Sequence, residues 1–308
     1  MNYKKKCHPE RSRGTGFTLV ELLTVLFIIG ALVGILIPAL NTVRRIAKEA
    51  KQKAQLTTIE MALEAFKNDY GDYPPSDWWA PPPASTGPQD YCGAQKLSEA
   101  LVGWDLRGFH PDSDFRATGR NDKGVYIYDP DNAVFLDQRK GPYLELATAN
   151  IYRLGASGRG MLDGLFDYST LGTTCPLAPN TYVLCDVFGV KPVYTAGVSR
   201  PVKAGAPILY YRANTSSKNL DAAAYENRIY NFRDNYPILT LRRLADWNKA
   251  FQFRMMHRLE DFQQFYEYIR DPKVSGRAWP YRPDSYILIS AGADGLYGTS
   301  DDIRNFGN

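Results

Sequence analysis

The chain carries a mostly apolar run from Phe17 to Leu40, in which Glu21 is the charged residue. The run holds 24 residues, which as a helix with a rise of about 1.5 Å per residue would reach roughly 36 Å. The hydrocarbon core of a bilayer is about 30 Å thick. The pattern therefore predicts that residues 17–40 form a membrane-spanning helix.

Helical periodicity continues beyond this run with a different composition. Apolar or small residues recur at spacings of three and four up to Tyr70, and Arg, Lys, Gln and Glu fill the other positions. Gly71, soon followed by two prolines, supplies a stop signal. We therefore expect one helix from Phe17 to about Tyr70. Residues 41–72 are predicted to be an amphipathic continuation of this helix. Its apolar face would pack on a globular body, residues 73–308.

The body has patterns of both secondary-structure types. Segments rich in β-branched and aromatic residues, bounded by turn residues, favour short strands. Helical spacing favours a short helix at Lys96–Val102 and one or two helices within 241–269. The predicted strands are 124–128, 141–146, 207–212 and 285–290. The mixture predicts an α+β body.

A short polar segment, residues 1–16, precedes the apolar run. It carries five Lys or Arg residues and one Glu, and it ends in Gly-Thr-Gly. An ordinary secretory signal peptide is excluded, because its apolar core of about 7 to 15 residues stands ahead of the cleavage site. Glu21 is also unusual, since charges inside membrane helices are costly and commonly functional. From position alone, however, Glu21 is equally compatible with a tolerated polar residue near a helix end.

The sequence Gly-Phe-Thr-Leu-Val-Glu at residues 16–21, between a basic leader and some twenty apolar residues, resembles the class III leader of type IV pilins and type II secretion pseudopilins. The resemblance implies a type IV pilin-like fold, with a long N-terminal helix packed on a body that contains a small antiparallel sheet. It implies that a prepilin peptidase cleaves between Gly16 and Phe17 and methylates the new amine of Phe17. It also implies that Glu21 pairs with the N-terminal amine of an adjacent subunit.

Location and partners follow from the same resemblance. The chain is expected to be a single-pass protein of the bacterial inner membrane, with its N-terminus in the cytoplasm and its body exported to the periplasm. The expected partners are the prepilin peptidase and methyltransferase, other pseudopilin subunits in a homo-oligomeric or mixed filament, an inner-membrane assembly platform, and membrane lipid.

Charge gives no reason to expect a nucleic-acid partner. Residues 1–16 hold five of the 37 basic residues and one of the 33 acidic residues, so the remainder holds 32 of each and is neutral. A basic stripe from Arg44 to Lys53 remains beside the apolar run. Lipid headgroups or acidic neighbours in an assembly would meet such a stripe.

A second informative segment, residues 289–303, holds three carboxylates and three glycines. Calcium takes 6 to 8 oxygen ligands, which such a loop could supply. A solvated acidic turn fits the residues equally well, and the spacing of an EF-hand is absent. The segment is similar to the calcium loop of the major type II secretion pseudopilin. The resemblance implies that Ca²⁺ binds to the side chains of Asp294, Asp301 and Asp302, with main-chain carbonyls near Ala291 and Leu296 as further ligands.

Three cysteines would remain after cleavage, because Cys7 belongs to the leader. In an oxidising compartment Cys175 and Cys185, which nine residues separate, could close a small disulfide loop and leave Cys92 unpaired. A structural zinc site is the weaker alternative, because the chain lacks a Cys-x-x-Cys spacing and has few histidines.

The sequence contains no motif that favours catalysis. Ser157 lies in a glycine-rich stretch that misses the Gly-x-Ser-x-Gly pattern, and no zinc-protease or Walker motif occurs. We therefore expect a structural subunit of a secretion pseudopilus or a related filament, and not an enzyme. The alternative is a filament-borne or membrane-tethered binding protein, because the middle of this chain is much longer than the body of the major pseudopilin. Its long middle region would then recognise a substrate or an exported partner.

Overall fold

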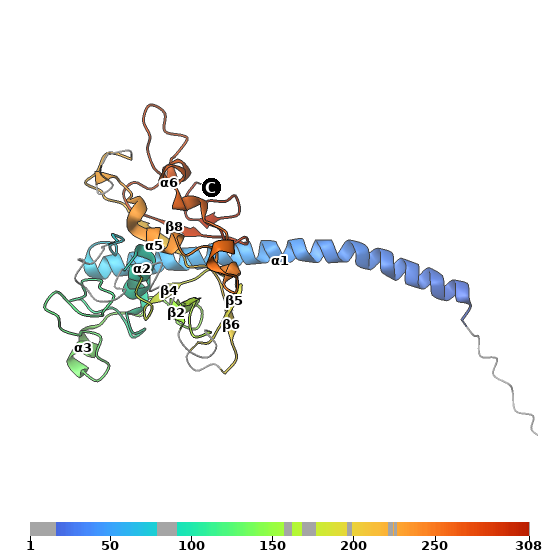
Figure 1. Cartoon of the computed structure of the whole chain (residues 1–308), viewed down its shortest axis with the longest axis horizontal. Coiled ribbons are helices and arrows are strands. Elements are labelled where there is room, and N and C mark those ends of the chain that lie inside the picture. Colours follow the sequence, from blue (N-terminus) through green and yellow to red (C-terminus); the bar gives the residue numbers. More distant parts are fainter. Residues whose placement is uncertain are drawn as a thin grey trace, which may run out of the picture. The chain divides into compact units, whose positions relative to one another are not determined.

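The computed structural model describes residues 17–78, 91–156, 162–167, 177–195, 199–220, 224 and 227–307. The fold is α+β, with a long N-terminal helix and a body of short helices and small, mainly antiparallel sheets (Figure 1). The chain divides into two compact units, of which one ends at Ala47 and the other begins at Lys48. The predicted fold class is thereby confirmed.

Helix α1 spans Leu19–Tyr70, a length of 52 residues, and includes Pro38. It ends where predicted, because Gly71 adopts a φ of +85°, a conformation that favours glycine. In the unit that begins at Lys48, the helix buries one face. The buried apolar residues follow the three- and four-residue spacing of a helix: Leu56, Ile59, Ala62, Leu63 and Phe66. The predicted boundary between residues 40 and 41 stays a prediction.

The central sheet of the body has three antiparallel strands in the order β7-β8-β9. The strands are β7 (Leu209–Arg212), β8 (Tyr286–Ser290) and β9 (Ile303–Arg304). Leu209 pairs with Ile289, and Ser290 pairs with Ile303. The predictions of strands within 207–212 and 285–290 are confirmed. Both runs are continuously apolar because both faces of this sheet are buried.

Alternate residues of β7 and β8 contribute to two hydrophobic clusters, as the period of two in a strand requires. Tyr210 and Leu288 belong to the cluster that contains the buried face of α1. Tyr211 and Ile287 belong to a second cluster, together with Phe265 of the helix α6 (Phe262–Ile269). The sheet therefore lies between α1 and the α6 side of the body, and the loop that joins β8 to β9 is held at its edge.

In the described part of the body, the other strands form three two-stranded sheets. Two pairs are antiparallel and one is parallel. The antiparallel pairs are β1 (Ile151–Arg153) with β4 (Tyr182–Leu184) and β5 (Lys191–Val193) with β6 (Val202–Ala204); the parallel pair is β2 (Gly155–Ala156) with β3 (Phe166–Asp167).

The remaining helices are short. The predicted helix at Lys96–Val102 is confirmed and begins slightly earlier, as α2 (Gly93–Val102). Within 241–269 one α-helix is found, α6, and three 3-10 turns precede it. The other short elements are α3 (Ala133–Gln138), η2 (Phe232–Asn235), α5 (Tyr236–Leu239), η3 (Leu244–Asp246), η4 (Phe251–Phe253) and η5 (Arg258–Glu260).

Two strand predictions are wrong. Residues 124–128 form no strand: Asn121 N–H donates to the carbonyl of Val125 at 3.0 Å across a turn, Gly124 has a φ of +76°, and Tyr126 makes an isolated bridge with Arg120. Residues 141–146 are irregular, because Gly141 has a φ of +83° and the following proline has no N–H for a ladder. Apolar and aromatic content in these segments reflects packing against the body rather than strand pairing.

Candidate assembly segment and acidic loop

The N-terminus of α1 is closed by hydrogen bonds between Thr18 and Glu21. The Glu21 carboxylate accepts bonds from the Thr18 main-chain N–H and from its hydroxyl, both at 2.8 Å. The Thr18 hydroxyl in turn accepts a bond from Glu21 N–H at 3.2 Å. This is the reciprocal capping box of a helix N-terminus. The Thr-x-x-Glu spacing ahead of an apolar run is the sequence signature of such a box and could have predicted it.

The predicted cleavage site lies at the edge of what the structure describes. Gly16 lies outside the described residues, so cleavage after it stays a prediction. Phe17 is 84% exposed, and the apolar side chains that follow it up to Ile46 are largely exposed as well. Helix α1 is long and apolar enough to cross a membrane, by length and composition. An apolar surface of this size requires lipid or neighbouring helices around it.

The loop between β8 and β9 brings the three predicted acidic residues into one network. Asp301 accepts bonds from the Asp294 main-chain N–H at 2.8 Å and from the Thr299 hydroxyl at 2.5 Å. Asp302 accepts bonds from Gly298 N–H at 2.7 Å and from the Tyr268 hydroxyl at 2.5 Å. Main-chain and hydroxyl donors thus hold the loop in a closed turn.

The ionisation of Asp294 and that of Asp301 influence each other. Burial, reinforced by the charge of Asp301, raises the pKa of Asp294. Burial also opposes the ionisation of Asp301, but bonds from Thr299 and Asp294 N–H outweigh it and lower the pKa of Asp301. Burial raises the pKa of Asp302 to about 6. The loop therefore concentrates acidic groups that repel one another when all are ionised.

The oxygen atoms of the loop converge on Thr299. Its hydroxyl lies 3.3 Å from the carbonyl oxygen of Leu296, 2.5 Å from Asp301 Oδ1 and 3.4 Å from Asp302 Oδ1. All these donors are hard oxygens, the type that Ca²⁺ prefers. Ala291 is fully buried beneath the loop. In the described ranges, however, no group of three or more His, Cys, Asp or Glu side chains is already placed to hold a metal ion. The donor set fits calcium in kind, and the carboxylates would have to turn toward the ion.

A buried carboxylate that sequence reasoning missed ties this loop to the body. Asp186 accepts a bond from the Ser290 hydroxyl at 3.2 Å, and also from the N–H groups of Phe188 at 3.0 Å and Ala206 at 3.2 Å. Burial raises its pKa to about 7, and the charge of Asp301 acts in the same direction. Because Asp186 is 104 residues away from Ser290 in sequence, no local pattern could have identified it.

We expect the substitution Gly292→Ala to destabilise the protein much more than Gly71→Ala. Both glycines have a positive φ, of +63° and +85°, so each alanine would carry a strain of about 1 to 2 kcal/mol. At Gly292 the added Cβ would also lie 2.2 Å from the carbonyl oxygen of Asp301, whereas at Gly71 it would meet nothing within 4 Å. The extra cost at Gly292 is on the order of 1 to 3 kcal/mol, measurable by denaturant unfolding. Equal costs at the two positions would show that the loop is not closed as described.

The predicted disulfide between Cys175 and Cys185 is not tested. Cys175 lies outside the described residues. Cys185 is fully buried, and its carbonyl accepts a bond from the Gln55 side chain of α1 at 2.9 Å. Cys92 is buried at the start of α2.

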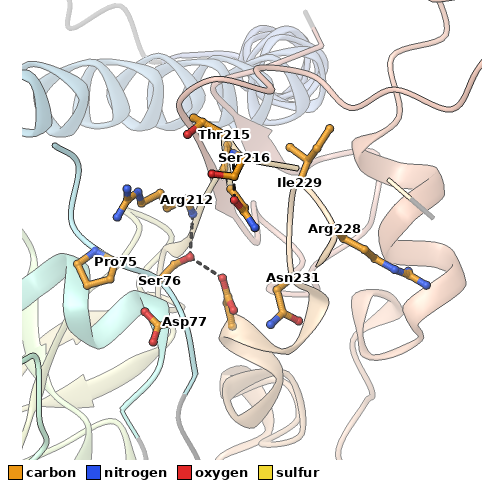
Figure 2. Close-up of a pocket in the computed structure, with 12 residues that line it drawn as sticks. Pro75, Ser76, Asp77, Arg212, Thr215, Ser216, Arg228, Ile229 and Asn231 are labelled. Atoms are coloured by element: carbon orange, nitrogen blue, oxygen red, sulfur yellow. Dashed lines mark hydrogen bonds between the residues drawn. The ribbon is translucent and has the colours of Figure 1, made fainter. Parts of the chain in front are cut away.

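The structure also contains a polar pocket that sequence reasoning did not predict. It has a cavity volume of about 330 Å³ and is lined mainly by polar side chains, among them Ser76, Asp77, Arg212, Arg228, Asn231 and Asp234. The Ser76 hydroxyl donates to Asp234 Oδ2 at 2.5 Å and accepts from Arg212 N–H at 2.9 Å (Figure 2). Asp234 is only 3% exposed, and burial raises its pKa to about 7.

This shift gives a testable pH dependence. A folded-state pKa near 7, against a usual value of 3.8, means that the folded chain keeps a proton that the unfolded chain has released. Stability from this group is therefore present below about pH 4 and is lost as the pH rises to about 7, by at most on the order of 4 kcal/mol. We expect Asp234→Asn to be more stable than the parent chain at pH 8 but not at pH 4, in thermal unfolding. The substitution Asp131→Asn, at an exposed position, serves as the control. If Asp234→Asn differed from the parent chain in stability by the same amount at pH 4 and at pH 8, this assignment would be contradicted.

Together, the fold and these sites define a protein with an exposed apolar N-terminal helix joined to an α+β body that ends in an acidic loop. Over 68 residues the chain is 31% identical to the type II secretion system core protein G of Aeromonas hydrophila. The matched stretch covers 22% of this chain and 48% of that protein. The chain thus spans about half the length of the curated relative it matches. No family model and no solved structure matches the chain.

Proposed function

We propose that this chain is a structural subunit of a type II secretion-type pseudopilus or a related type IV pilus-like filament. The observation that carries the proposal is the exposed apolar run 17–40 at the start of α1, in which Glu21 is the charged residue, on a helix long enough to cross a membrane. The local similarity to a secretion-system core protein supports it. Such a role needs no catalytic residues, in agreement with the expectation that the chain is not an enzyme.

In this proposal the chain is stored in the bacterial inner membrane after a prepilin peptidase has cut between Gly16 and Phe17 and methylated Phe17. The N-terminus faces the cytoplasm and the body is exported to the periplasm. An inner-membrane assembly platform then adds the chain to a filament of pseudopilin subunits through α1. Lipid covers the apolar surface of α1 before assembly, and neighbouring helices cover it afterwards.

Calcium binding by the acidic loop is part of the proposal. Asp294, Asp301 and Asp302 would supply side-chain oxygens, with the carbonyls of Leu296 and Ala291 as further ligands. Support comes from the convergence of oxygens on Thr299 and from the mutual repulsion of the acidic groups, which a divalent cation would relieve. The ion would stiffen the loop that joins two strands of the central sheet.

The experiment that tests the proposal directly is mass spectrometry of the mature N-terminus. In cells that contain a prepilin peptidase, the purified chain is expected to begin with N-methylphenylalanine at Phe17. A Gly16→Leu variant, in which cleavage is blocked, provides the control and should retain residues 1–16. A native chain that still begins at Met1, or one that begins beyond Leu40, would contradict the proposal.

The polar pocket supports a second candidate function, a filament-borne or membrane-tethered binding protein whose long middle region recognises a substrate or an exported partner. The pocket combines two arginines, two aspartates and several neutral polar groups, a set that suits a small polar ligand. If Ser76→Ala impaired secretion while filaments still formed, this second function would gain support over a purely structural role.

A further inference from the structure

In the body, one stretch of ten residues, 253–262, contains four exposed large hydrophobic side chains. They are Phe253 (68% exposed), Met255 (48%), Met256 (55%) and Phe262 (41%). Among the described residues from Lys48 onward, the other exposed large hydrophobic side chains are Met61, Val125, Val134, Leu146 and Val202, and no stretch of ten residues holds more than two of them. Single exposed hydrophobic residues are normal, whereas a group of them commonly marks an interaction surface. We refer to residues 247–262 as the apolar segment.

The backbone of this segment is fixed although four of its apolar side chains are exposed. The Asp246 carboxylate accepts bonds from Arg243 Nη2 at 2.9 Å and from Met255 N–H at 3.1 Å, and it forms an ion pair with Lys249 Nζ at 2.9 Å. Arg243 N–H donates to the carbonyl of Met255, and Arg254 Nε donates to the carbonyl of Lys249. The segment is therefore preorganised, so that little conformational entropy would be lost when a partner covers it.

The apolar segment and the residues just before it carry an excess of basic side chains. Residues 242–262 contain five Lys or Arg residues and three Asp or Glu residues, a net charge of +2, whereas residues 17–308 together are neutral. Arg242 forms an ion pair with Glu260, and Asp246 forms ion pairs with Arg243 and Lys249. His257 adds no charge near neutral pH, because burial lowers its pKa to about 4. Exposed aromatic and methionine side chains among cations are the combination that favours the interface of an anionic membrane. A second copy seated patch to patch would instead face a surface of like charge.

Contacts within the body place the apolar segment near the first turns of α1 that belong to the body. Gln52 of α1 accepts a bond from Val187 N–H at 2.9 Å. Four residues after Val187, the Lys191 ammonium lies 5.3 Å from the ring centre of Trp247, the first residue of the apolar segment. Gln52 follows Leu40 by twelve residues, which as a helix span roughly 18 Å. Trp247, at the start of the apolar segment, is thus connected through the chain between Lys191 and Val187 to the part of α1 that belongs to the body.

We propose that the apolar segment docks on the anionic lipid surface of the membrane that holds α1, before the chain is assembled. Phe253 and Met256 enter the interface, and the exposed side chains of Lys249 and Arg258 meet lipid phosphates. The contact would be weak for a free protein, but the tether raises the effective concentration of the surface to the millimolar range. Docking would hold the body at the membrane surface until assembly moves the body away from the lipid. The inference rests on the membrane tether of the proposed function.

The test uses the full chain, reconstituted in liposomes of phosphatidylcholine and phosphatidylglycerol at a ratio of about 3:1, the second lipid supplying the anionic charge. Phe253 is replaced by the photo-crosslinking residue p-benzoylphenylalanine, and irradiation products are identified by mass spectrometry. Met61, which is 61% exposed on α1, carries the same probe in a matched control. We expect lipid adducts from position 253 and few from position 61. In liposomes of phosphatidylcholine alone, adducts from position 253 should fall on the order of tenfold.

Flotation of the liposomes separates the two hypotheses. A chain that does not float with the lipid would contradict the membrane tether itself. A chain that floats but gives equal adducts from positions 253 and 61 would overturn lipid docking while the tether stands. Crosslinks from position 253 to a second copy, in place of lipid, would show that the apolar segment is a contact between subunits and would also overturn the inference. As a further arm, Met256→Ser should reduce lipid adducts from position 253, because its exposed side chain contributes to insertion and not to the core.

Discussion

Replacing Glu21 with alanine is expected to abolish filament assembly and the secretion that depends on it, while the processed chain still accumulates in the membrane. In the proposed filament, the carboxylate neutralises the N-terminal amine of the neighbouring subunit and fixes the stagger between the two chains. Without it, a buried amine would be left unpaired in an apolar core, which strongly disfavours the contact. The loss should be seen as absent filaments by electron microscopy and as retained cargo in a secretion assay.

The capping box adds a complication that the choice of variants resolves. Glu21→Ala removes the charge and also the bonds that Glu21 accepts from Thr18. Glu21→Gln removes the charge but keeps a side-chain oxygen that can accept from Thr18, so it is the matched control for capping. If intersubunit pairing is the role of the carboxylate, both variants should fail to assemble.

The reverse pattern would show that Glu21 acts only by capping the N-terminus of α1. In that case Glu21→Gln would assemble normally, and Thr18→Ala, which removes the capping hydroxyl, would be impaired. Loss of an N-cap costs typically about 1 kcal/mol, so the damage would be graded rather than complete. If all of these variants assembled and only deletions within 73–240 mattered, the binding function would become the better hypothesis.

The sequence predicted the elements whose residues obey one dominant period. Helix α1 was predictable because its apolar run and its later three- and four-residue spacing describe the same helix, and Gly71 ends it by its positive φ. β8 was predictable because both of its faces are buried, so a continuous apolar run marks it. The segments 124–128 and 141–146 have similar compositions, but a local turn and a proline prevent ladder formation there.

The candidate sites divide in the same way. The acidic residues of the β8–β9 loop could be found from sequence because they lie within nine residues of one another. Asp186 could not, because its contact with Ser290 arises only when β7 and β8 pair and bring the chain after β4 to the base of the loop. Asp234 was missed for the same reason, since its partner Ser76 is 158 residues away. Long-range burial creates these groups, and no local pattern records it.

Calcium is expected to raise the unfolding temperature of the full chain in detergent by about 5 to 10 °C. A ligand at 100 times its dissociation constant stabilises the folded state by about 2.7 kcal/mol, and each kcal/mol shifts the midpoint by roughly 2 to 4 °C at this chain length. The physical source is the crowding of Asp294, Asp301 and Asp302, whose repulsion the cation would relieve. The measurement compares thermal unfolding in a chelator with unfolding at about 1 mM calcium.

Substitutions decide whether this shift comes from the loop. Asp294→Asn and Asp301→Asn should each remove most of the calcium effect, whereas the exposed Asp131→Asn should keep it. In the chelator, Asp294→Asn should be no less stable than the parent chain, because it relieves the repulsion with Asp301 without the ion. Magnesium should shift the midpoint less, since it demands octahedral geometry at about 2.0 to 2.1 Å and gives up water reluctantly. Identical unfolding curves in chelator and calcium would remove the loop from consideration as a metal site, and its carboxylates would then be the acidic groups of a closed, solvated turn.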